Sequence, residues 1–299
     1  MALIFVDLIL LTLVFGLWSL VCVLIKIAHS PDSDDAFMFW ALKHGLVASA
    51  QYQFQIERHD IEQLNQLAKD EVYDITALSL HAYAHVTDRY VLTSSGASFA
   101  EKDYGPLVVA KKNISPDQLF KHVVAVPGEL TTALLLLKIF EPRLTYLVMP
   151  FDQIIPAVLG GRVDAGLIIH EGQLQYQKMG LTRILSLIDV WHGLAGDLPL
   201  PLGGSAIKRS LGEKIISDLS NLQKQSIQFA LNHPEEARDY ARGFKRDMTT
   251  DEADQYLRWY ANERTLEMGE EGQRAIQLLY ELARERGLLM AQSSKRNEY

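Results

Sequence analysis

From residue 25 onward the chain alternates short apolar, strand-like runs with helix-like segments. This alternation is typical of βαβ units, and it predicts mainly parallel sheets with helices on both faces. Apolar runs of about four to eight residues between turn formers indicate strands that are covered on both faces. We therefore expect an α/β protein with strands at 25–29, 52–57, 73–78, 106–110, 123–126, 144–148 and 165–169.

Two irregular stretches interrupt this alternation and indicate two lobes. The sequence has 299 residues, and a domain usually takes about 100–200. Residues 94–105 contain Gly and Ser, residues 198–204 are rich in Pro and Gly, and we interpret both as crossings between lobes. The last third is helical and is expected to wrap the first lobe. The predicted map is an apolar segment at 1–24, a large α/β lobe at 25–98 and 205–292, a small α/β lobe at 99–204 and a polar tail at 293–299.

Two α/β lobes joined by two crossings are the plan of the type II periplasmic-binding-protein-like fold. A ligand lies in the central cleft of such folds, and closure of the lobes excludes water. The net charge is −8 and no basic block is dense, so we expect no nucleic-acid partner. Cys22 is the only cysteine, which excludes an internal disulfide framework and a metal–thiolate cluster and is compatible with a reducing compartment.

Residues 1–24 are almost wholly apolar and reach the length of about 20 residues that a membrane-spanning helix needs. No Lys or Arg precedes the run and no small-x-small cleavage site follows it, so we do not expect secretion by cleavage. If the segment spans a membrane, the weak charge bias between Asp7 and Lys26 keeps the body of the protein in the cytoplasm. Two interpretations stay open: an anchor on the inner face of the membrane, or an over-extended start with translation beginning near residue 23, which we favour. Membrane contact is expected only if the segment is real.

The segment 164–172 reads Asp-Ala-Gly-Leu-Ile-Ile-His-Glu-Gly, so a buried strand ends directly in His170 and Glu171. Ligands of α/β sheets bind beyond the carboxyl ends of strands, and histidine suits proton transfer near neutral pH. His170 is therefore a candidate catalytic residue; the alternative is a structural histidine bonded to a backbone carbonyl. Glu171 is a further candidate substrate-binding residue; alternatively, it orients the histidine or favours the start of the next helix. Tyr176 and Trp191 are expected nearer the cleft, as ligand contacts or as packing.

Three predicted strand-to-helix junctions carry hydroxyl side chains. Unpaired backbone N–H groups at helix starts favour anions, and hydroxyls add adjustable donors, so a carboxylate or polyhydroxy ligand suits them. The alternative is ordinary helix capping. The candidate ligand-binding residues at these junctions are Ser30, Ser79, Thr131 and Thr132.

Metal-binding patterns are weak. His81 and His85 are four residues apart on a predicted helix, but spacing supplies no third ligand. Asp32, Asp34 and Asp35 fit the acidic first turn of a helix better than a calcium loop. We expect no metal site. The sequence also lacks a phosphate loop, a dinucleotide fingerprint and a Gly-x-Ser-x-Gly elbow, which disfavours nucleotide-driven chemistry.

Six ordered motifs together resemble the menaquinone-biosynthesis family that contains 1,4-dihydroxy-6-naphthoate synthase of the futalosine pathway. The resemblance covers about residues 25–289. The motifs are Ser30-Pro31-Asp32 leading to Phe37, Leu78-Ser79 with Ala82-Tyr83, Gly105 to Ala110, Pro127-Gly128 with Thr131-Thr132-Ala133, Gly166 to Glu171, and Leu198 to Gly203.

The resemblance implies a carbon–carbon lyase that converts cyclic dehypoxanthine futalosine to 1,4-dihydroxy-6-naphthoate and releases the sugar-derived fragment, with no metal or organic cofactor. It also implies that His170 is the base and that Thr131 and Thr132 line the ligand site, with Ser30 and Ser79 at comparable junctions.

This chain departs from the family pattern at two places that bear on substrate contacts. It has Asp-Ser-Asp-Asp at 32–35 where the family has Cys-Pro-Asn-Asp, and Ala77 where some members carry a basic residue. Two alternatives remain: the related chorismate dehydratase, and a non-enzymatic solute-binding protein, since one fold hosts both classes. The His170–Glu171 pair favours an enzyme, because a binding protein needs no base at that strand end.

Overall fold

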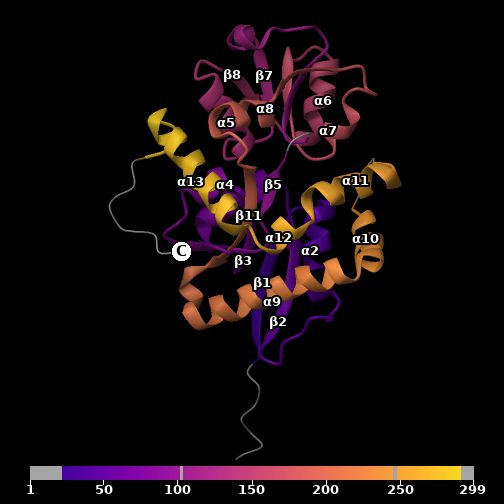
Figure 1. Ribbon diagram of the computed structural model, residues 1–299, viewed down its shortest axis with the longest axis vertical. Helices are drawn as coiled ribbons and strands as arrows, with labels where there is room; N and C mark the ends of the chain where they lie inside the picture. The colour runs from indigo at the N-terminus through magenta and orange to yellow at the C-terminus, as the bar shows by residue number, and fades with distance from the viewer. Residues whose placement is uncertain (1–21, 102–103, 245–247, 291–299) are drawn as a thin grey trace, which may run out of the picture.

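The computed structural model describes residues 22–101, 104–244 and 248–290. They form two α/β lobes, one above the other in Figure 1, and each lobe is built around one sheet. The large-lobe sheet has the strand order β2-β1-β3-β11-β4, and β5 pairs with β11. Its strands are β1 (Val23–His29), β2 (Tyr52–Arg58), β3 (Ile75–Ser79), β4 (Tyr90–Leu92), β5 (Ser98–Ala100) and β11 (Leu200–Lys208).

The small-lobe sheet has the strand order β10-β6-β9-β7-β8. Its strands β6, β7 and β9 are buried along their length or nearly so, as the apolar runs predict. The strands are β6 (Leu107–Ala110), β7 (Val123–Val126), β8 (Thr145–Val148), β9 (Ala165–Ile168) and β10 (Thr182–Ser186).

Both sheets are mixed, so the expectation of mainly parallel pairing is wrong. Strand β1 is parallel to β2 and β3, and β7 is parallel to β8 and β9. Strand β11 is antiparallel to β3, and β6 is antiparallel to both β9 and β10. The reason is the crossing chain: β5 leaves the large lobe and β11 re-enters it in the opposite direction, with Leu200 opposite Ala100.

The amino-terminal boundary differs slightly from the expected one. Strand β1 begins at Val23, inside the apolar segment that we predicted to end at residue 24. The choice between an anchor and an over-extended start concerns residues that lie mostly outside the described part of the chain, which begins at residue 22. Within the described ranges, no helix is long and apolar enough to cross a membrane.

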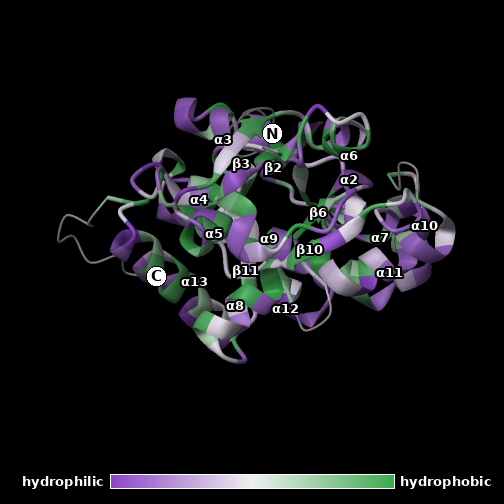
Figure 2. Ribbon diagram, turned by 90° about the horizontal axis from the view of Figure 1, so that it is seen from above, coloured by the Kyte–Doolittle hydropathy of each residue, from purple (hydrophilic) through white to green (hydrophobic). Residues whose placement is uncertain are grey.

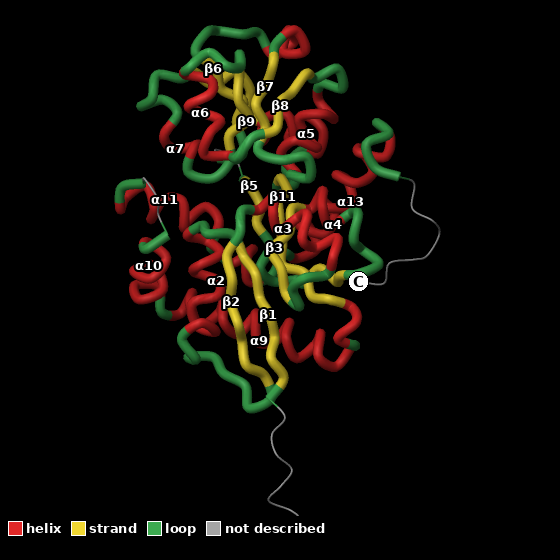
Figure 3. Tube along the Cα trace, turned by 180° about the vertical axis from the view of Figure 1, so that it is seen from behind, coloured by secondary structure: helices red, strands yellow, loops and turns green. Residues whose placement is uncertain are grey.

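Helices cover the sheets of both lobes (Figures 1 and 3). Thr249 forms a capping box with Glu252 at the start of α11. Gly212 occupies the N-cap position of α9. The helices are α2 (Ser33–Lys43), α3 (Ile61–Leu67), α4 (Leu80–Tyr83), α5 (Thr132–Phe140), α6 (Phe151–Leu159), α7 (Gly172–Gln175), α8 (Leu187–Ala195), α9 (Glu213–Asn232), α10 (Pro234–Arg242), α11 (Thr250–Tyr260), α12 (Glu263–Leu266) and α13 (Gly269–Glu285), with short 3₁₀ turns at Ala68–Asp70, Pro116–Lys121 and Arg209–Leu211.

The carboxyl-terminal helices do more than wrap the large lobe. Helices α9, α10 and α11 pack against α2, as expected, but α13 packs against α5 of the small lobe and against β11. The hydroxyl of Tyr280 on α13 donates to the carbonyl of Leu80, 2.8 Å away. Figure 2 shows many hydrophilic residues along α10 and α11, whereas α5 is built mostly of hydrophobic residues. Helix α13 therefore joins the two lobes.

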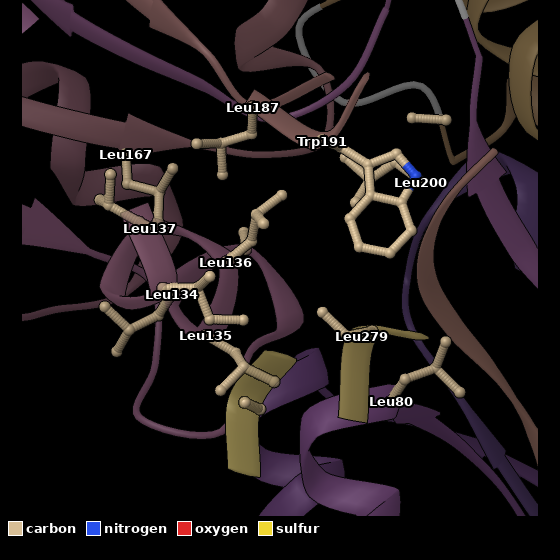
Figure 4. Close-up of a cluster of buried hydrophobic side chains, with 14 of the residues drawn as sticks. Leu80, Leu134, Leu135, Leu136, Leu137, Leu167, Leu187, Trp191, Leu200 and Leu279 are labelled. Atoms are coloured by element: carbon tan, nitrogen blue, oxygen red, sulfur yellow. The ribbon is translucent and has the colours of Figure 1, made fainter. Parts of the chain in front are cut away.

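A single hydrophobic core runs through this junction (Figure 4). Trp191 lies in it with no exposed surface, and its Nε1 donates to the carbonyl of Leu198 at 2.8 Å. Tyr176 packs in a separate small-lobe core. Both aromatic residues, expected nearer the cleft, are packing residues. The labelled core side chains of Figure 4 are Leu80, Leu134, Leu135, Leu136, Leu137, Leu167, Leu187, Trp191, Leu200 and Leu279.

Leu136→Ala is expected to lower the free energy of unfolding by about 2–5 kcal/mol, because it leaves a cavity in this shared core. Leu136 has no exposed surface. The control is Leu194→Ala, since Leu194 on α8 is 42% exposed and its truncation should cost little. Urea unfolding followed by circular dichroism measures both variants; equal losses would contradict the assignment of Leu136 to a tightly packed core.

Candidate active site

A pocket lies between the lobes and encloses about 730 Å³, its open mouth included. It is lined by the carboxyl end of β1 and the start of α2, by the end of β3, by both crossing segments, by the start of α5, by the end of β9 and by α11. The main polar side chains of its lining are Ser30, Asp32, Asp34, Asp35, Ser79, Ser98, Thr131, Thr132, His170, Gln173, Tyr256 and Tyr260.

His170 reaches this pocket from the turn that follows β9. The strand lies close to α6: a Cβ on Gly166 would come within 2.4 Å of Ile154 Cγ2, so only glycine fits there. His170 then adopts a left-handed backbone with φ of 53°. That conformation costs an L-residue about 1–2 kcal/mol, and its presence at a pocket edge is a mark of functional sites. The turn aims the imidazole at the opposite lobe.

The imidazole of His170 meets Asp32 of the large lobe. Nδ1 lies 3.0 Å from Asp32 Oδ2, and the side chains are only 17% and 4% exposed. The hydroxyl of Ser30 donates to the same Asp32 oxygen at 2.7 Å, and the hydroxyl of Tyr256 lies 3.4 Å from Nδ1. The ring of Phe151 packs edge-on against the imidazole. A proton on Nδ1 donates to the carboxylate and makes Nε2 the basic nitrogen of the neutral ring.

The first turn of α2 carries two further buried carboxyl groups. Asp35 Oδ2 accepts from the backbone N–H of Ser30 at 2.7 Å. Burial, followed by the charges of Asp35 and Asp32, raises the pKa of Asp34 to about 8. Burial also raises the pKa of Asp35, which the neighbouring His29 partly opposes. We predicted an acidic turn that complements the helix dipole, but Asp32 makes no side-chain capping bond and pairs with His170 instead.

The predicted threonine junction forms the amino terminus of α5. Thr131 is the N-cap, and its Oγ1 accepts from the backbone N–H of Leu134 at 3.4 Å. The hydroxyl of Thr132 donates to the carbonyl of Leu202 at 2.5 Å and accepts from the backbone N–H of His81 at 3.2 Å. These bonds tie the small lobe to a crossing strand and to the large lobe. Free backbone N–H groups of this helix start would favour an anion in the pocket.

Ser79 occupies the third junction, at the end of β3. Its Oγ accepts from Asn65 Nδ2 at 3.1 Å, and its backbone N–H donates to Asn65 Oδ1 at 2.9 Å. Glu62 on the same helix as Asn65 accepts from the backbone N–H of Leu130 at 3.1 Å, across the lobe boundary. The Ser79 hydroxyl is therefore held in place by a network that also fixes the entry to α5.

Residues that were not predicted complete the pocket. Gln173 Oε1 accepts from the hydroxyl of Tyr260 at 3.1 Å and from the backbone N–H of Gly105 at 2.9 Å. Burial raises the pKa of Tyr256 and of Tyr260, so both remain neutral hydrogen-bonding groups. The only signal for these tyrosines was their helical spacing on the stretch 250–262, which is also typical of packing.

The structure brings five of the six predicted site residues to one pocket. His170, Thr131, Thr132, Ser30 and Ser79 all line it. Glu171 lies at the start of α7 and is not among the lining residues.

The helix expected to carry both histidines is shorter than predicted: His81 lies on α4, which ends at Tyr83, and His85 lies beyond it. The rings of His81 and His85 lie 5.3 Å apart, and burial lowers the pKa of His81 to about 4. Within the described part of the chain, no three His, Cys, Asp or Glu side chains are grouped so that they could hold a metal ion.

Two mixed α/β lobes with a pocket at their junction define a protein of the periplasmic-binding-protein-like fold, as predicted. The alkanesulfonate-binding protein SsuA from Xanthomonas axonopodis pv. citri superposes with a TM-score of 0.65 at 12% identity, over 90% of this chain and 94% of that one. At this identity the likeness shows the fold alone. Protein AF1704 from Archaeoglobus fulgidus superposes with a TM-score of 0.83 at 44% identity, over 89% of this chain and 98% of that one.

The sequence comparisons identify the family. Residues 25–285 match the family described as menaquinone biosynthesis. A protein of Thermus thermophilus named 1,4-dihydroxy-6-naphthoate synthase is 39% identical over 265 residues, which cover 88% of this chain and 95% of that protein. The chain belongs to the menaquinone biosynthesis family, and the resemblance seen in the sequence is confirmed.

Proposed function

We propose that this chain is a 1,4-dihydroxy-6-naphthoate synthase that converts cyclic dehypoxanthine futalosine to 1,4-dihydroxy-6-naphthoate and releases the sugar-derived fragment. The observation that carries the proposal is the His170–Asp32 pair at the wall of the inter-lobe pocket, in a member of the menaquinone biosynthesis family. The name of the 39% identical relative supports the choice of reaction.

His170 acts as the base that starts the fragmentation. The Asp32 carboxylate accepts a hydrogen bond from Nδ1–H, holds the ring, and stabilises the imidazolium that forms when Nε2 takes a proton from the substrate. The carbon–carbon bond then breaks, and the proton on His170 can return to the carbon that keeps the electron pair. The proton and electrons balance within the substrate and the histidine, so we propose a lyase reaction without a cofactor.

The amino terminus of α5 binds the substrate carboxylate in this proposal. Thr131 and Thr132 line the pocket there, with Ser79 beside them. Ser30 lies on the opposite side, where its hydroxyl supports Asp32. The carboxylate is thus held at one wall and the reacting carbons lie near the His170–Asp32 pair.

Thr132→Val is expected to raise KM by about tenfold, because the Thr132 hydroxyl fixes the start of α5 to Leu202 and His81, and the loss of these bonds displaces the proposed carboxylate site. Thr132→Ser keeps the hydroxyl and should stay close to the parent. Thr145→Val, at an exposed position of β8, is the matched control. Steady-state kinetics of the three variants test this; an unchanged KM in Thr132→Val would remove that hydroxyl from the binding site.

The direct test is an incubation of purified protein with cyclic dehypoxanthine futalosine, followed by liquid chromatography and mass spectrometry for 1,4-dihydroxy-6-naphthoate. Chorismate in a parallel reaction tests the related dehydratase activity. Tight binding of the futalosine derivative without any product would support a solute-binding protein instead. The likeness to solute-binding proteins at 12% identity favours no such role, since it shows the fold alone.

We propose that the enzyme works in the cytoplasm on this small-molecule substrate, since its single cysteine fits a reducing compartment. Mass spectrometry of the native amino terminus distinguishes an anchor from an over-extended start: a peptide that contains Asp7 would contradict the start near residue 23.

A further inference from the structure

Asp34 is a pocket residue to which the proposed reaction gives no role. It lies in the first turn of α2, it is 7% exposed, and it lines the pocket. Its Oδ1 is buried and has no hydrogen-bond partner among the described residues. Its neighbours are engaged: Asp32 with His170 and Ser30, and Asp35 with the Ser30 backbone. Buried polar atoms are nearly always paired, so an orphan atom in a pocket wall points to a ligand.

The surroundings of Asp34 oppose a third negative charge. Burial is the main cause that raises its pKa to about 8, the charges of Asp35 and Asp32 add to it, and His170 acts in the opposite direction. The tyrosines of α11 are themselves neutral, because burial raises their pKa. Asp34 therefore carries its proton near neutral pH. The titratable groups around it are Asp32, Asp35 and His29 on its own side, His170 from the small lobe, and Tyr256 and Tyr260 from α11.

We infer that Asp34 binds the substrate as an uncharged carboxyl group and donates a hydrogen bond to a neutral oxygen, a hydroxyl or a carbonyl, of its sugar-derived part. This inference rests on the proposed function. The acidic turn would repel a carboxylate, whereas the start of α5 attracts one, so the two walls select opposite ends of the ligand. Asp34 is two residues from Asp32, and Asp32 contacts His170. The uncharged, sugar-derived end of the substrate is therefore placed beside His170.

The test is the pH profile of kcat/KM from pH 6 to 10, which reports ionisations of the free enzyme. In the parent, kcat/KM is expected to fall about fivefold between pH 8 and 9 as Asp34 loses its proton. Asp34→Asn should lack this alkaline decline, because an amide donates a hydrogen bond without titrating. Asp34→Ala should lose activity at every pH. The exposed Asp88→Asn is the control and should follow the parent.

A second measurement needs no substrate. A carboxyl whose pKa is higher in the folded than in the unfolded state binds more protons when folded, so stability falls as pH rises between the two values. The stability of the parent should therefore decline relative to Asp34→Asn between pH 4 and 8. Parallel stability profiles, or the same alkaline limb of kcat/KM in both proteins, would overturn the inference. A parent that forms no product at any pH would refute the proposed reaction, while the stability profiles would still decide the protonation of Asp34.

Discussion

His170→Ala is expected to lower kcat for the conversion of cyclic dehypoxanthine futalosine by a factor of about 10² to 10⁴. Alanine removes the proposed base from the wall of the pocket, while the proposed carboxylate site at α5 keeps its residues. KM should therefore change little. Single-turnover product formation at neutral pH, with the protein in excess, measures the loss directly.

Two controls separate chemistry from folding. His192→Ala changes a histidine of α8 that does not line the pocket, and it should retain the activity of the parent. Thermal unfolding of His170→Ala should show a lower midpoint than that of the parent, since the buried Asp32 carboxylate loses its partner, but the variant should remain folded at the assay temperature. Full activity in His170→Ala would refute the role of this residue as the base.

The position of His170 could be predicted from sequence because it depends on a local rule. A buried strand ends at the edge of its sheet, and a polar residue that follows it faces the region where ligands bind. The same rule brought Ser30, Ser79, Thr131 and Thr132 to the pocket wall, since each lies at the end of a strand or in the segment that follows one.

The partner of His170 could not be predicted in this way. Asp32 has the sequence context of a helix cap, and nothing near it indicates a histidine in the other lobe. In the sequence, Tyr256 and Tyr260 have the helical spacing of packing residues. They line the pocket only because of the way in which α11 docks on α2, and this docking cannot be read from the sequence of the helix. Contacts between lobes depend on the relative placement of whole elements, which no local pattern records.

The errors in the fold have the same origin. Strands β4 and β5 have three residues each, too few for a periodic signal, and β5 is fixed by its pairing with β11. The direction of β11 follows from the route of the chain between lobes, so mixed sheets could not be recognised from apolar runs alone. Helix α13 has an ordinary amphipathic pattern, and only its docking against α5 shows that it joins the lobes.

Asp32→Asn is expected to lower kcat by a factor of about 10² to 10³ while KM stays within a few-fold of the parent. Asparagine keeps the shape of the side chain but loses the charge that stabilises the imidazolium, and its amide can turn a donor toward Nδ1 and impose the wrong tautomer. Asp32 is thus a positioning residue that acts through the 3.0 Å contact with His170. Ser30→Ala removes only the hydrogen bond from the Ser30 hydroxyl to Asp32 and should lower kcat less than Asp32→Asn does.

The double variant decides whether Asp32 acts through His170. If the two residues work as a unit, Asp32→Asn in the background of His170→Ala should cause almost no further loss of kcat, because the base that Asp32 orients is already gone. Losses that multiply would mean that Asp32 contributes by a separate route, such as the fold of the α2 turn. Circular dichroism and urea unfolding of Asp32→Asn measure its effect on the fold independently. A destabilised Asp32→Asn variant, together with losses of kcat that multiply in the double variant, would contradict a catalytic role of the Asp32–His170 pair.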